Sequence, residues 1–277
     1  MNKTRFSKCA VLITGCSSGI GKVCALGLHQ RGYRVFASGR RLEALQSLAD
    51  AGLETVELDV TNDDSIKKAI KLILDKTDGA LYGVFNNAGY GQLGAVEDLS
   101  RAQMQAQFDT NVFGMIRVTQ AVLPIFRQQG YGRIVQNSSI LGLVARTFSG
   151  AYTASKFAVE GFSDTLRLEL HKTGIFVSII EPGPIHSLFR THAFKQVHEM
   201  DIQNSHYADT YKALLKKGPN LNAPFMLGPE AVLKVLLHAL ESRHPKTRYP
   251  VTLYGHMFTH LKRWMPTGIL DKILLKA

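Results

Sequence analysis

Cysteine is scarce in this sequence, which has three cysteines among its 277 residues, at positions 9, 16 and 24. Their spacing fits no compact metal-binding pattern, and an odd number of cysteines argues against a framework of disulfides. A small secreted scaffold held by disulfides is therefore excluded, and a reducing compartment is favoured. We expect the three side chains to serve as small packing residues.

Long apolar runs are absent as well. No stretch approaches the ~18 consecutive apolar residues that a membrane-spanning helix requires. The apolar run from Cys9 to Ile13 follows three basic residues, but it is too short for the core of a secretory signal peptide. We therefore expect a cytoplasmic protein without an export signal.

Clustered charge is the third absence. The net charge is +11, yet the lysines and arginines are scattered, without a basic run and without interleaved aromatic residues. Nucleic-acid-binding surfaces usually concentrate their positive charge on one face or in one segment. We interpret the charge as a solvated basic surface and expect no nucleic-acid partner.

The composition itself is that of a globular protein, with 45% hydrophobic and 20% charged residues and no low-complexity tract or repeat period. A single globule of this length can bury roughly 75% of its extended-chain surface, so one large core is possible. Apolar stretches of strand length alternate with segments of helical periodicity. We predict strands at residues 9–14, 34–39, 55–59, 82–86, 133–138, 176–181 and 249–253, and helices at 19–31, from about 63, and at 103–129, 151–170 and 230–241.

Tyr152 and Lys156 are four residues apart in a segment with helical spacing of its apolar residues, so both side chains should lie on one helix face. A phenol titrates near pH ~10, and proton exchange near neutrality requires its anion to be stabilised by about 4 kcal/mol. One positive charge ~4 Å away, at an effective dielectric constant of ~20, supplies about that amount. The pair is therefore a candidate proton-transfer site, although the same spacing also occurs on exposed helices without a catalytic role.

Ser139 follows the predicted strand 133–138. A hydroxyl at the carboxyl end of a strand faces the crevice in which open α/β sheets bind their ligands. Ser139 is therefore a third candidate for the same site.

Three glycines, Gly15, Gly19 and Gly21, occupy the predicted turn between the first strand and the first helix. Glycine at such a turn lets the backbone bend sharply and approach a pyrophosphate, which then contacts the free N–H groups at the helix start. The spacing differs from the G-x-G-x-x-G pattern, and a purely structural glycine turn is the alternative.

The second predicted strand ends in Gly39, where an NAD-binding enzyme would carry a carboxylate for the ribose hydroxyls. Arg40 and Arg41 follow directly. A guanidinium pairs with a phosphate through charge-assisted hydrogen bonds, whereas a carboxylate would repel it. The sequence therefore predicts NADP (NADPH) as the cofactor, while Arg41 is also explained as the start of a surface helix.

Five motifs occur in a fixed order along the chain: Thr14-Gly15-Cys16-Ser17-Ser18-Gly19-Ile20-Gly21, Asn86-Asn87-Ala88-Gly89, Asn111, Ser139 with Tyr152 and Lys156, and Pro182-Gly183. In this order the chain resembles the short-chain dehydrogenase/reductase family over about residues 8–253. Within the family it is most similar to bacterial NADP-dependent aldehyde reductases, relatives of the retinol and 17-beta-hydroxysteroid dehydrogenases. The resemblance implies a single doubly wound, Rossmann-like α/β domain over residues 1–277 with a seven-stranded parallel sheet.

The resemblance also implies catalytic roles. Tyr152 would donate a proton to a carbonyl oxygen while the cofactor delivers hydride, and Ser139 would polarise the carbonyl. Lys156 would lower the pKa of the tyrosine and hold the ribose, with support from Asn111 through a water molecule. The alternative for Asn111 is a buried amide that is simply paired within a packed helix.

A longer set of residues is implied to bind the cofactor: Gly15, Ser17, Ser18, Gly19, Ile20, Gly21, Arg40, Arg41, Asp59, Val60, Asn87, Ala88, Gly89, Tyr152, Lys156, Pro182, Gly183, Ile185 and Ser187. Asp59 would contact the adenine ring, with a turn or helix cap as its alternative role, and Asn87 would in part stabilise the sheet. Ser187 replaces a threonine that is common in the family and keeps the hydroxyl.

The segment from Pro184 to Leu227 has no strong periodicity, and the resemblance implies that it is the substrate lid. Its apolar residues favour an apolar aldehyde or ketone as the substrate; they are Leu188, Phe189, Phe194, Phe225 and Met226. Arg190 and Lys195 would favour a carboxylate-bearing substrate if they faced the pocket, but we expect them to face solvent. The lid histidines, His186, His192, His198 and His206, fit no compact zinc spacing, so no metal site is predicted.

We therefore predict NADPH-dependent reduction of an aldehyde or ketone to an alcohol, with a catalytically inactive NADP(H)-binding sensor as the alternative. A sugar-nucleotide epimerase on a related fold is disfavoured by the chain length and the glycine spacing. Apolar outer faces on the predicted helices 103–129 and 151–170 favour a homo-oligomer. The tail, residues 255–277, mixes apolar and basic residues; contact with a membrane surface is one interpretation, and packing over the lid or a partner subunit is the more common arrangement.

Overall fold

The computed structural model describes residues 9–220 and 225–275. Residues 221–224 of the predicted lid, residues 276–277 of the predicted tail and residues 1–8 of the predicted domain lie outside the described residues.

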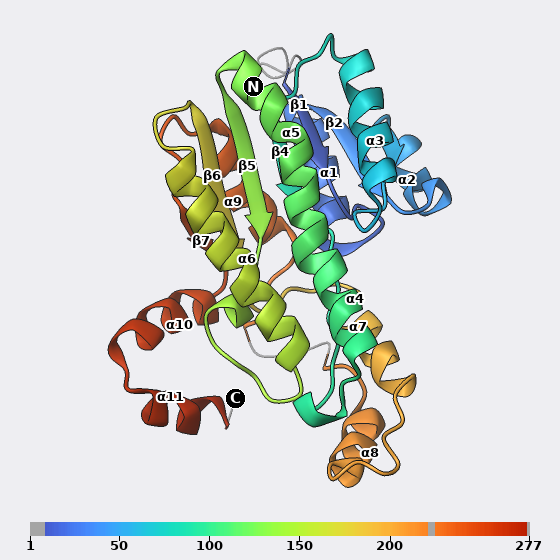
Figure 1. The fold of residues 1–277 in the computed structure, drawn as a ribbon, viewed down its shortest axis with the longest axis vertical. Helices are drawn as coiled ribbons and strands as arrows, with labels where there is room; N and C mark the ends of the chain where they lie inside the picture. The colour runs from blue at the N-terminus through green and yellow to red at the C-terminus, as the bar shows by residue number, and fades with distance from the viewer. Residues whose placement is uncertain (1–8, 221–224, 276–277) are drawn as a thin grey trace.

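Parallel strands form one sheet of seven in the described part of the chain, in the order β3-β2-β1-β4-β5-β6-β7 (Figure 1). The strands are β1 (Ala10–Ile13), β2 (Arg34–Gly39), β3 (Glu54–Glu57), β4 (Gly83–Asn86), β5 (Gly132–Asn137), β6 (Ile175–Glu181) and β7 (Arg248–Pro250). The strand order reverses between β1 and β4, which confirms the predicted doubly wound fold. In such sheets the ligand crevice lies outside the carboxyl ends of the strands at this reversal.

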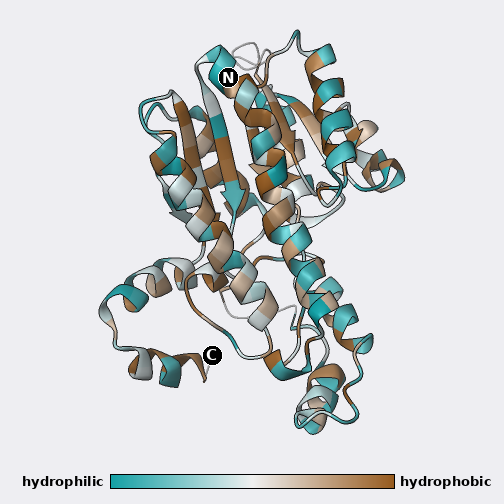
Figure 2. Cartoon of the chain, viewed as in Figure 1, coloured by the Kyte–Doolittle hydropathy of each residue, from teal (hydrophilic) through white to brown (hydrophobic). Residues whose placement is uncertain are grey.

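Helices cover both faces of the sheet. On one face lie α1 (Gly19–Arg31) and α9 (Glu230–Glu241); on the other lie α3 (Asp63–Lys76), α5 (Met115–Gln129) and α6 (Gly150–Glu169). The strands are therefore apolar on both sides, as parallel strands usually are. In β1, Val11 and Ile13 belong to the core on the α1 side, and Ala10 and Leu12 belong to the core on the α3 side. Figure 2 shows this concentration of hydrophobic residues in the strands.

The predicted continuous helix 103–129 needs a correction. It consists of α4 (Arg101–Phe108), a π-helical turn (Asp109–Gly114) and α5. A π-helical turn contains one more residue than an α-helical turn and is often found at functional sites. Gly114, the last residue of this turn, allows a close approach of Val60, because a Cβ at this position would lie 2.8 Å from the Val60 carbonyl oxygen. Asn111 lies within this turn.

The predicted lid contains two helices that the sequence analysis did not predict, α7 (Phe189–His198) and α8 (Ala208–Lys217). Ala193, Val197 and Tyr211 of these helices form a separate small core with Leu93 and Ala95. The Tyr211 hydroxyl accepts a hydrogen bond from the Ala95 N–H at 2.7 Å and donates one to the Asp98 carboxylate at 2.8 Å. These contacts come from the segment after β4, so the lid helices depend on tertiary packing.

The last strand is shorter than predicted, because Thr252 begins a helix. The Thr252 hydroxyl accepts a hydrogen bond from the Gly255 N–H at 3.2 Å, and α10 (Leu253–Trp264) follows, so the predicted strand 249–253 ends at Pro250. The tail then continues into α11 (Thr267–Leu274). Phe258 and Leu270 pack against Val144 in the loop before α6, whereas Trp264 remains 80% exposed.

Two short helical segments follow β2, a 3₁₀ helix (Leu42–Leu45) and α2 (Gln46–Ala49). None of the helices in residues 9–220 and 225–275 combines the length and the apolar character that a bilayer-spanning helix would need.

Candidate active site

The glycine turn after β1, which contains Gly15, Gly19 and Gly21, is held to the segment after β4 by hydrogen bonds. Gly15 has a φ of +72°, and a Cβ at this position would lie 2.8 Å from the Cα of Ala88, so a larger residue is excluded by both strain and space. The Thr14 hydroxyl accepts hydrogen bonds from the N–H groups of Asn87 and Ala88, each at 2.9 Å. The Asn87 amide returns hydrogen bonds to the carbonyls of Thr14 and Gly15, at 3.0 and 3.1 Å.

The start of α1 is arranged to receive an anion. Ser18 is the N-cap residue, but its side chain makes no capping hydrogen bond, and the first turn of the helix has no acidic residue. The N–H groups of that first turn, from Gly19 to Gly21, have no partner within the helix. Ser17 is exposed and Ser18 half-buried beside them. A pyrophosphate fits this set of free donors, because helix N-termini attract negative charge.

Arg40 and Arg41 follow β2 and are both exposed. Among the described residues, neither is paired with a carboxylate. Arg40 lies near enough to Tyr90 to lower the pKa of its phenol, although burial and Asp109 act in the opposite direction and raise that pKa. Arg40 therefore lies within electrostatic range of Tyr90 in the segment that follows β4.

Asp59 is engaged in a local turn. Its carboxylate accepts hydrogen bonds from the N–H and the hydroxyl of Thr61, at 2.9 and 2.7 Å. The neighbouring Val60 is buried and packs against the π-helical turn. The geometry corresponds to the turn role that the sequence analysis kept as an alternative for Asp59, and it leaves the predicted contact with adenine untested.

Tyr152 and Lys156 lie together on α6, as their spacing predicts. The Lys156 Nζ is 5.7 Å from the centre of the Tyr152 ring, and its ammonium donates a hydrogen bond to the Asn137 carbonyl at 2.7 Å. The Asn137 amide in turn donates to the Asn87 side-chain oxygen at 2.9 Å. A chain of hydrogen bonds therefore connects the candidate catalytic lysine to the glycine turn through Asn87. The sequence analysis did not select Asn137, although a polar residue at the end of an apolar strand was a visible signal.

The electrostatics of Tyr152 differ from the prediction. Burial raises the pKa of its phenol to about 12, while a hydrogen bond with the Ser139 hydroxyl and the charge of Arg146 act to lower it. The sequence analysis assigned that lowering effect to Lys156. Burial lowers the pKa of Lys156 itself to about 8, against the opposing effect of Glu160. Arg146 is a further cation that acts on the tyrosine, and no sequence motif indicated it. The predicted effect of Lys156 on the pKa of Tyr152 stays a prediction.

Asn111 is almost fully buried, and its amide is paired. The side-chain oxygen accepts a hydrogen bond from the Tyr90 N–H at 3.1 Å, and the amide nitrogen donates to the Tyr90 carbonyl at 3.0 Å and the Ser155 hydroxyl at 3.2 Å. Asn111 thus contacts the sequence neighbour of Lys156 and holds the segment after Gly89 against α6. Its predicted support of Lys156 through water stays a prediction.

The segment after β6, from Pro182 to Ser187, packs beside the glycine turn. The Pro182 carbonyl accepts a hydrogen bond from the Ile140 N–H at 2.9 Å, which joins this segment to the one that carries Ser139. Gly183 lies directly against Thr252, and Ile185 is buried. A Cβ on Gly19 would lie 3.0 Å from the Cβ of Ser187, so Ser187 lies beside the start of α1.

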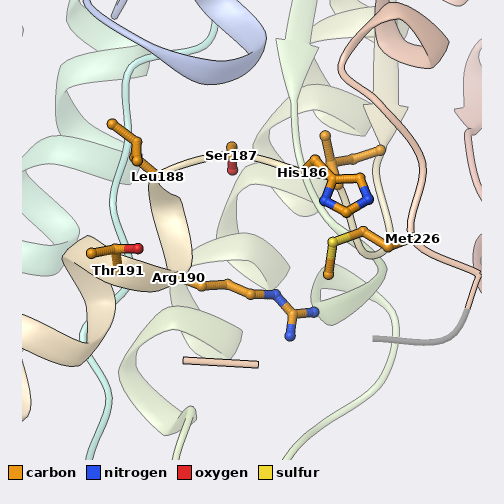
Figure 3. Close-up of a pocket in the computed structure, with 7 residues that line it drawn as sticks. His186, Ser187, Leu188, Arg190, Thr191 and Met226 are labelled. Atoms are coloured by element: carbon orange, nitrogen blue, oxygen red, sulfur yellow. The ribbon is translucent and has the colours of Figure 1, made fainter. Parts of the chain in front are cut away.

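The predicted lid forms a pocket next to these residues. Its volume is about 220 Å³, and it is lined by Ile185, His186, Ser187, Leu188, Arg190, Thr191 and Met226 (Figure 3). The Phe189 ring lies 5.2 Å from the Tyr152 ring, between centres. Two other predicted pocket residues lie elsewhere: Phe194 packs within the lid core, and Phe225 packs against Tyr254.

Arg190 contradicts the expectation that it faces solvent, because it lines the pocket and is half-buried. Lys195 is exposed, as expected. The four lid histidines are exposed, and within the described ranges no three metal-ligating side chains gather into a group that could hold a metal ion.

Arg248 of β7 forms ion pairs with three carboxylates near Lys156. Its guanidinium donates hydrogen bonds to Glu160, to Asp164 at 2.6 Å and to Glu181 at 2.7 Å. Burial raises the pKa of Glu160 to about 7 and also raises the pKa of Glu181, while Arg248 lowers both. The cluster joins α6 to β6 and β7 one helical turn beyond the candidate catalytic lysine.

Comparison with known proteins places this geometry in a family. The family model for "short chain dehydrogenase" matches residues 9–198. The uncharacterized oxidoreductase YbbO of Escherichia coli K12 is 42% identical, with 96% of this chain and 93% of the relative covered. Human retinol dehydrogenase 5 is 35% identical, with coverage of 97% and 88%. The crystal structure of a short-chain dehydrogenase from Streptomyces avermitilis is 29% identical, with a TM-score of 0.77 and coverage of 97% and 94%.

Proposed function

The chain belongs to the short-chain dehydrogenase family, and we propose that this oxidoreductase uses NADPH to reduce an aldehyde or ketone to an alcohol. The observation that carries the proposal is the continuous set of hydrogen bonds from Lys156 through Asn137 and Asn87 to the glycine turn. It connects the residues suited to proton transfer with the residues suited to hold a dinucleotide.

In the proposed mechanism, the protonated phenol of Tyr152 donates its proton to the carbonyl oxygen of the substrate. A pKa of about 12 favours the protonated form that reduction requires. The Ser139 hydroxyl orients the same oxygen, and Lys156 binds the ribose and maintains positive charge near the phenol. When bound, NADPH supplies the hydride.

The proposed cofactor residues are those of the glycine turn, Arg40, Arg41, the segments after β3 and β4, and the segment from Pro182 to Ser187. The uncapped start of α1 supports a pyrophosphate site. The exposed guanidiniums of Arg40 and Arg41, without a carboxylate partner in the described part of the chain, support a phosphate on the ribose.

The proposed substrate has an apolar chain, because Ile185, Leu188 and Met226 line the pocket and Phe189 packs against Tyr152. Each buried methylene contributes about 0.8 kcal/mol, or nearly fourfold in affinity. We therefore expect KM to fall by up to about fourfold per added methylene along a series of straight-chain aldehydes, until the pocket is full. The measurement is NADPH oxidation, with hexoses as the polar control; equal KM values along the series would contradict an apolar site.

The same screen distinguishes the alternative function. A sensor that retains the fold without catalysis would bind NADPH tightly and turn over none of the aliphatic, aromatic, retinoid or steroid carbonyls. Tight binding without turnover would therefore support the sensor and contradict the enzyme.

A pH prediction follows from Glu160, which raises the pKa of Lys156 from one helical turn away. Glu160→Gln removes this negative charge, so Lys156 should lose its proton at lower pH. We expect the alkaline limb of the kcat/KM profile to move down by roughly one pH unit. Glu169→Gln, on the exposed end of the same helix, is the control. An unmoved alkaline limb would show that the Lys156 ammonium does not limit activity.

We further propose that the domain spans residues 1–277, with the lid at 184–227 and the tail at 255–277. Exposed apolar side chains on α6, namely Phe157, Phe162 and Leu168, support a homo-oligomer formed through this helix. The cytoplasmic location expected from the sequence stays a prediction.

A further inference from the structure

Arg190 lines the pocket, Arg146 lies near Tyr152, and the two share one property. Neither guanidinium forms an ion pair with any carboxylate in the part of the chain that the structure describes. Arg190 donates a hydrogen bond to the Asn220 carbonyl at 2.8 Å. Arg146 donates two to the Ser149 hydroxyl, at 3.2 and 3.1 Å. Both are held by neutral acceptors, which leave their charge uncompensated.

The position of each arginine is fixed by its surroundings. Ser149 is the residue before α6, so the Arg146 guanidinium is anchored one helical turn before Tyr152. Arg190 is the second residue of α7, and Figure 3 shows its side chain extending across the pocket toward Met226. Phe189, which directly precedes Arg190 in the chain, packs against the Tyr152 ring. Arg146 therefore lies near the phenol from the segment before α6, and Arg190 lines the pocket from α7.

The electrostatics connect the three groups. Burial lowers the pKa of both guanidiniums, and Arg146 lowers the pKa of Arg190 further by like-charge repulsion. Tyr152 raises the pKa of Arg146, and the Arg146 residue as a whole is exposed. Two neighbouring cations that lack a counterion are costly, and the cost is offset when an anion binds between them.

The rest of the pocket is mixed: Ile185, Leu188 and Met226 contribute apolar surface, and His186, Ser187 and Thr191 contribute polar groups. An inorganic anion would leave the apolar side chains without a partner, and a plain hydrocarbon would leave the guanidiniums without one. A ligand that has both an apolar chain and a carboxylate satisfies both parts of the pocket.

We propose that Arg146 and Arg190 bind a carboxylate of the substrate, so that the preferred substrate is an oxo acid with an apolar chain. This proposal rests on the proposed function, because the carbonyl of the same molecule must reach Tyr152. The sequence led us to expect that Arg190 faces solvent and that a carboxylate on the substrate is not favoured, and the proposal revises this expectation. The expected decrease of KM with the length of the apolar chain is retained. The two arginines are specificity residues, and proton transfer stays with Tyr152.

The test compares straight-chain aldehydes that carry a terminal carboxylate with their methyl esters, at several chain lengths. The measured quantity is the ratio of kcat/KM for acid and ester. We expect the acid to be favoured by about tenfold or more at the best length, since a charge-assisted pair of hydrogen bonds is lost in the ester. Arg146→Gln and Arg190→Gln should each reduce the ratio at least about fivefold, and Arg190→Lys should retain part of it.

Lys195→Gln, on the exposed side of α7, is the matched control and should keep the wild-type ratio. A ratio near one at every chain length, or an unchanged ratio in both glutamine variants, would overturn the proposal. An increased KM for NADPH with an unchanged ratio would also overturn it, because the arginines would then serve the cofactor. Thermal melting of each variant establishes that it is folded.

A second measurement separates this proposal from the proposed function. If no carbonyl compound is reduced, the proposed function fails, and the anion site is tested by titrating octanoate into the NADPH-saturated protein in a calorimeter. Saturable binding that Arg190→Gln weakens at least about fivefold would support the site. Absence of saturable binding to the wild-type protein would overturn it.

Discussion

Tyr152→Phe is expected to lower kcat by about 10² to 10⁴, the range that a positioned general acid contributes. The substitution removes the phenolic proton and leaves the ring, so the packing against Phe189 is preserved. NADPH should still bind, because the contacts of the glycine turn and Lys156 do not involve the phenol oxygen. The two measurements are the steady-state rate of NADPH oxidation and a fluorescence titration with NADPH.

Tyr131→Phe is the control for this substitution, because Tyr131 is an exposed tyrosine at the amino end of β5, far in the chain from α6. It should keep the wild-type rate. If Tyr152→Phe retained more than about a tenth of kcat, the proton would have to come from another group. Ser139 would then be the first alternative, since its hydroxyl lies close enough to lower the pKa of the same phenol.

Arg40→Asp is expected to reverse the choice of cofactor. The wild-type protein should prefer NADPH over NADH by about tenfold to a hundredfold in kcat/KM, the value of one or two charge-assisted hydrogen bonds to the ribose phosphate. An aspartate at this position would repel the phosphate and accept hydrogen bonds from the ribose hydroxyls of NADH. The measurement is kcat/KM for both cofactors at one ionic strength, because salt screens exposed charges.

Arg41→Asp tests the neighbouring residue and should have the smaller effect, since Arg41 directly precedes the 3₁₀ helix as its N-cap residue. Arg243→Asp, an exposed residue before β7, controls for the change in net charge. Equal kcat/KM values for NADPH and NADH in the wild-type protein would contradict the assignment of Arg40. They would leave the nucleotide-binding turn itself intact.

The sequence predicted the fold well because the determining signals are local. Parallel strands that are buried on both faces appear as short apolar runs, and the residues that follow them, such as Gly15, Asn87 and Ser139, mark their carboxyl ends. The spacing of Tyr152 and Lys156 on one helix is also a local property. These features identify the edge of the sheet at which a site can form.

The features that the sequence did not predict depend on contacts between distant segments. The π-helical turn that contains Asn111 ends at Gly114, which packs against Val60. Val60 precedes α3 and is therefore distant from Gly114 in the sequence. The lid helices are held by a core that includes Leu93 and by the hydrogen bond from Tyr211 to Asp98. Arg146 and Arg190 belong to no motif, and only the fold brings Arg146 near Tyr152 and Arg190 near Arg146.

Arg248 has a consequence for the order in which the protein matures during synthesis. Its partners Glu160, Asp164 and Glu181 precede it by 88, 84 and 67 residues, so they leave the ribosome well before their counterion does. Until β7 is added, burial of Glu160 and Glu181 is unfavourable, because it would place uncompensated negative charge in the interior. The helix that carries Tyr152 and Lys156 should therefore reach its final position only late in translation, after the nucleotide-binding half has had time to form.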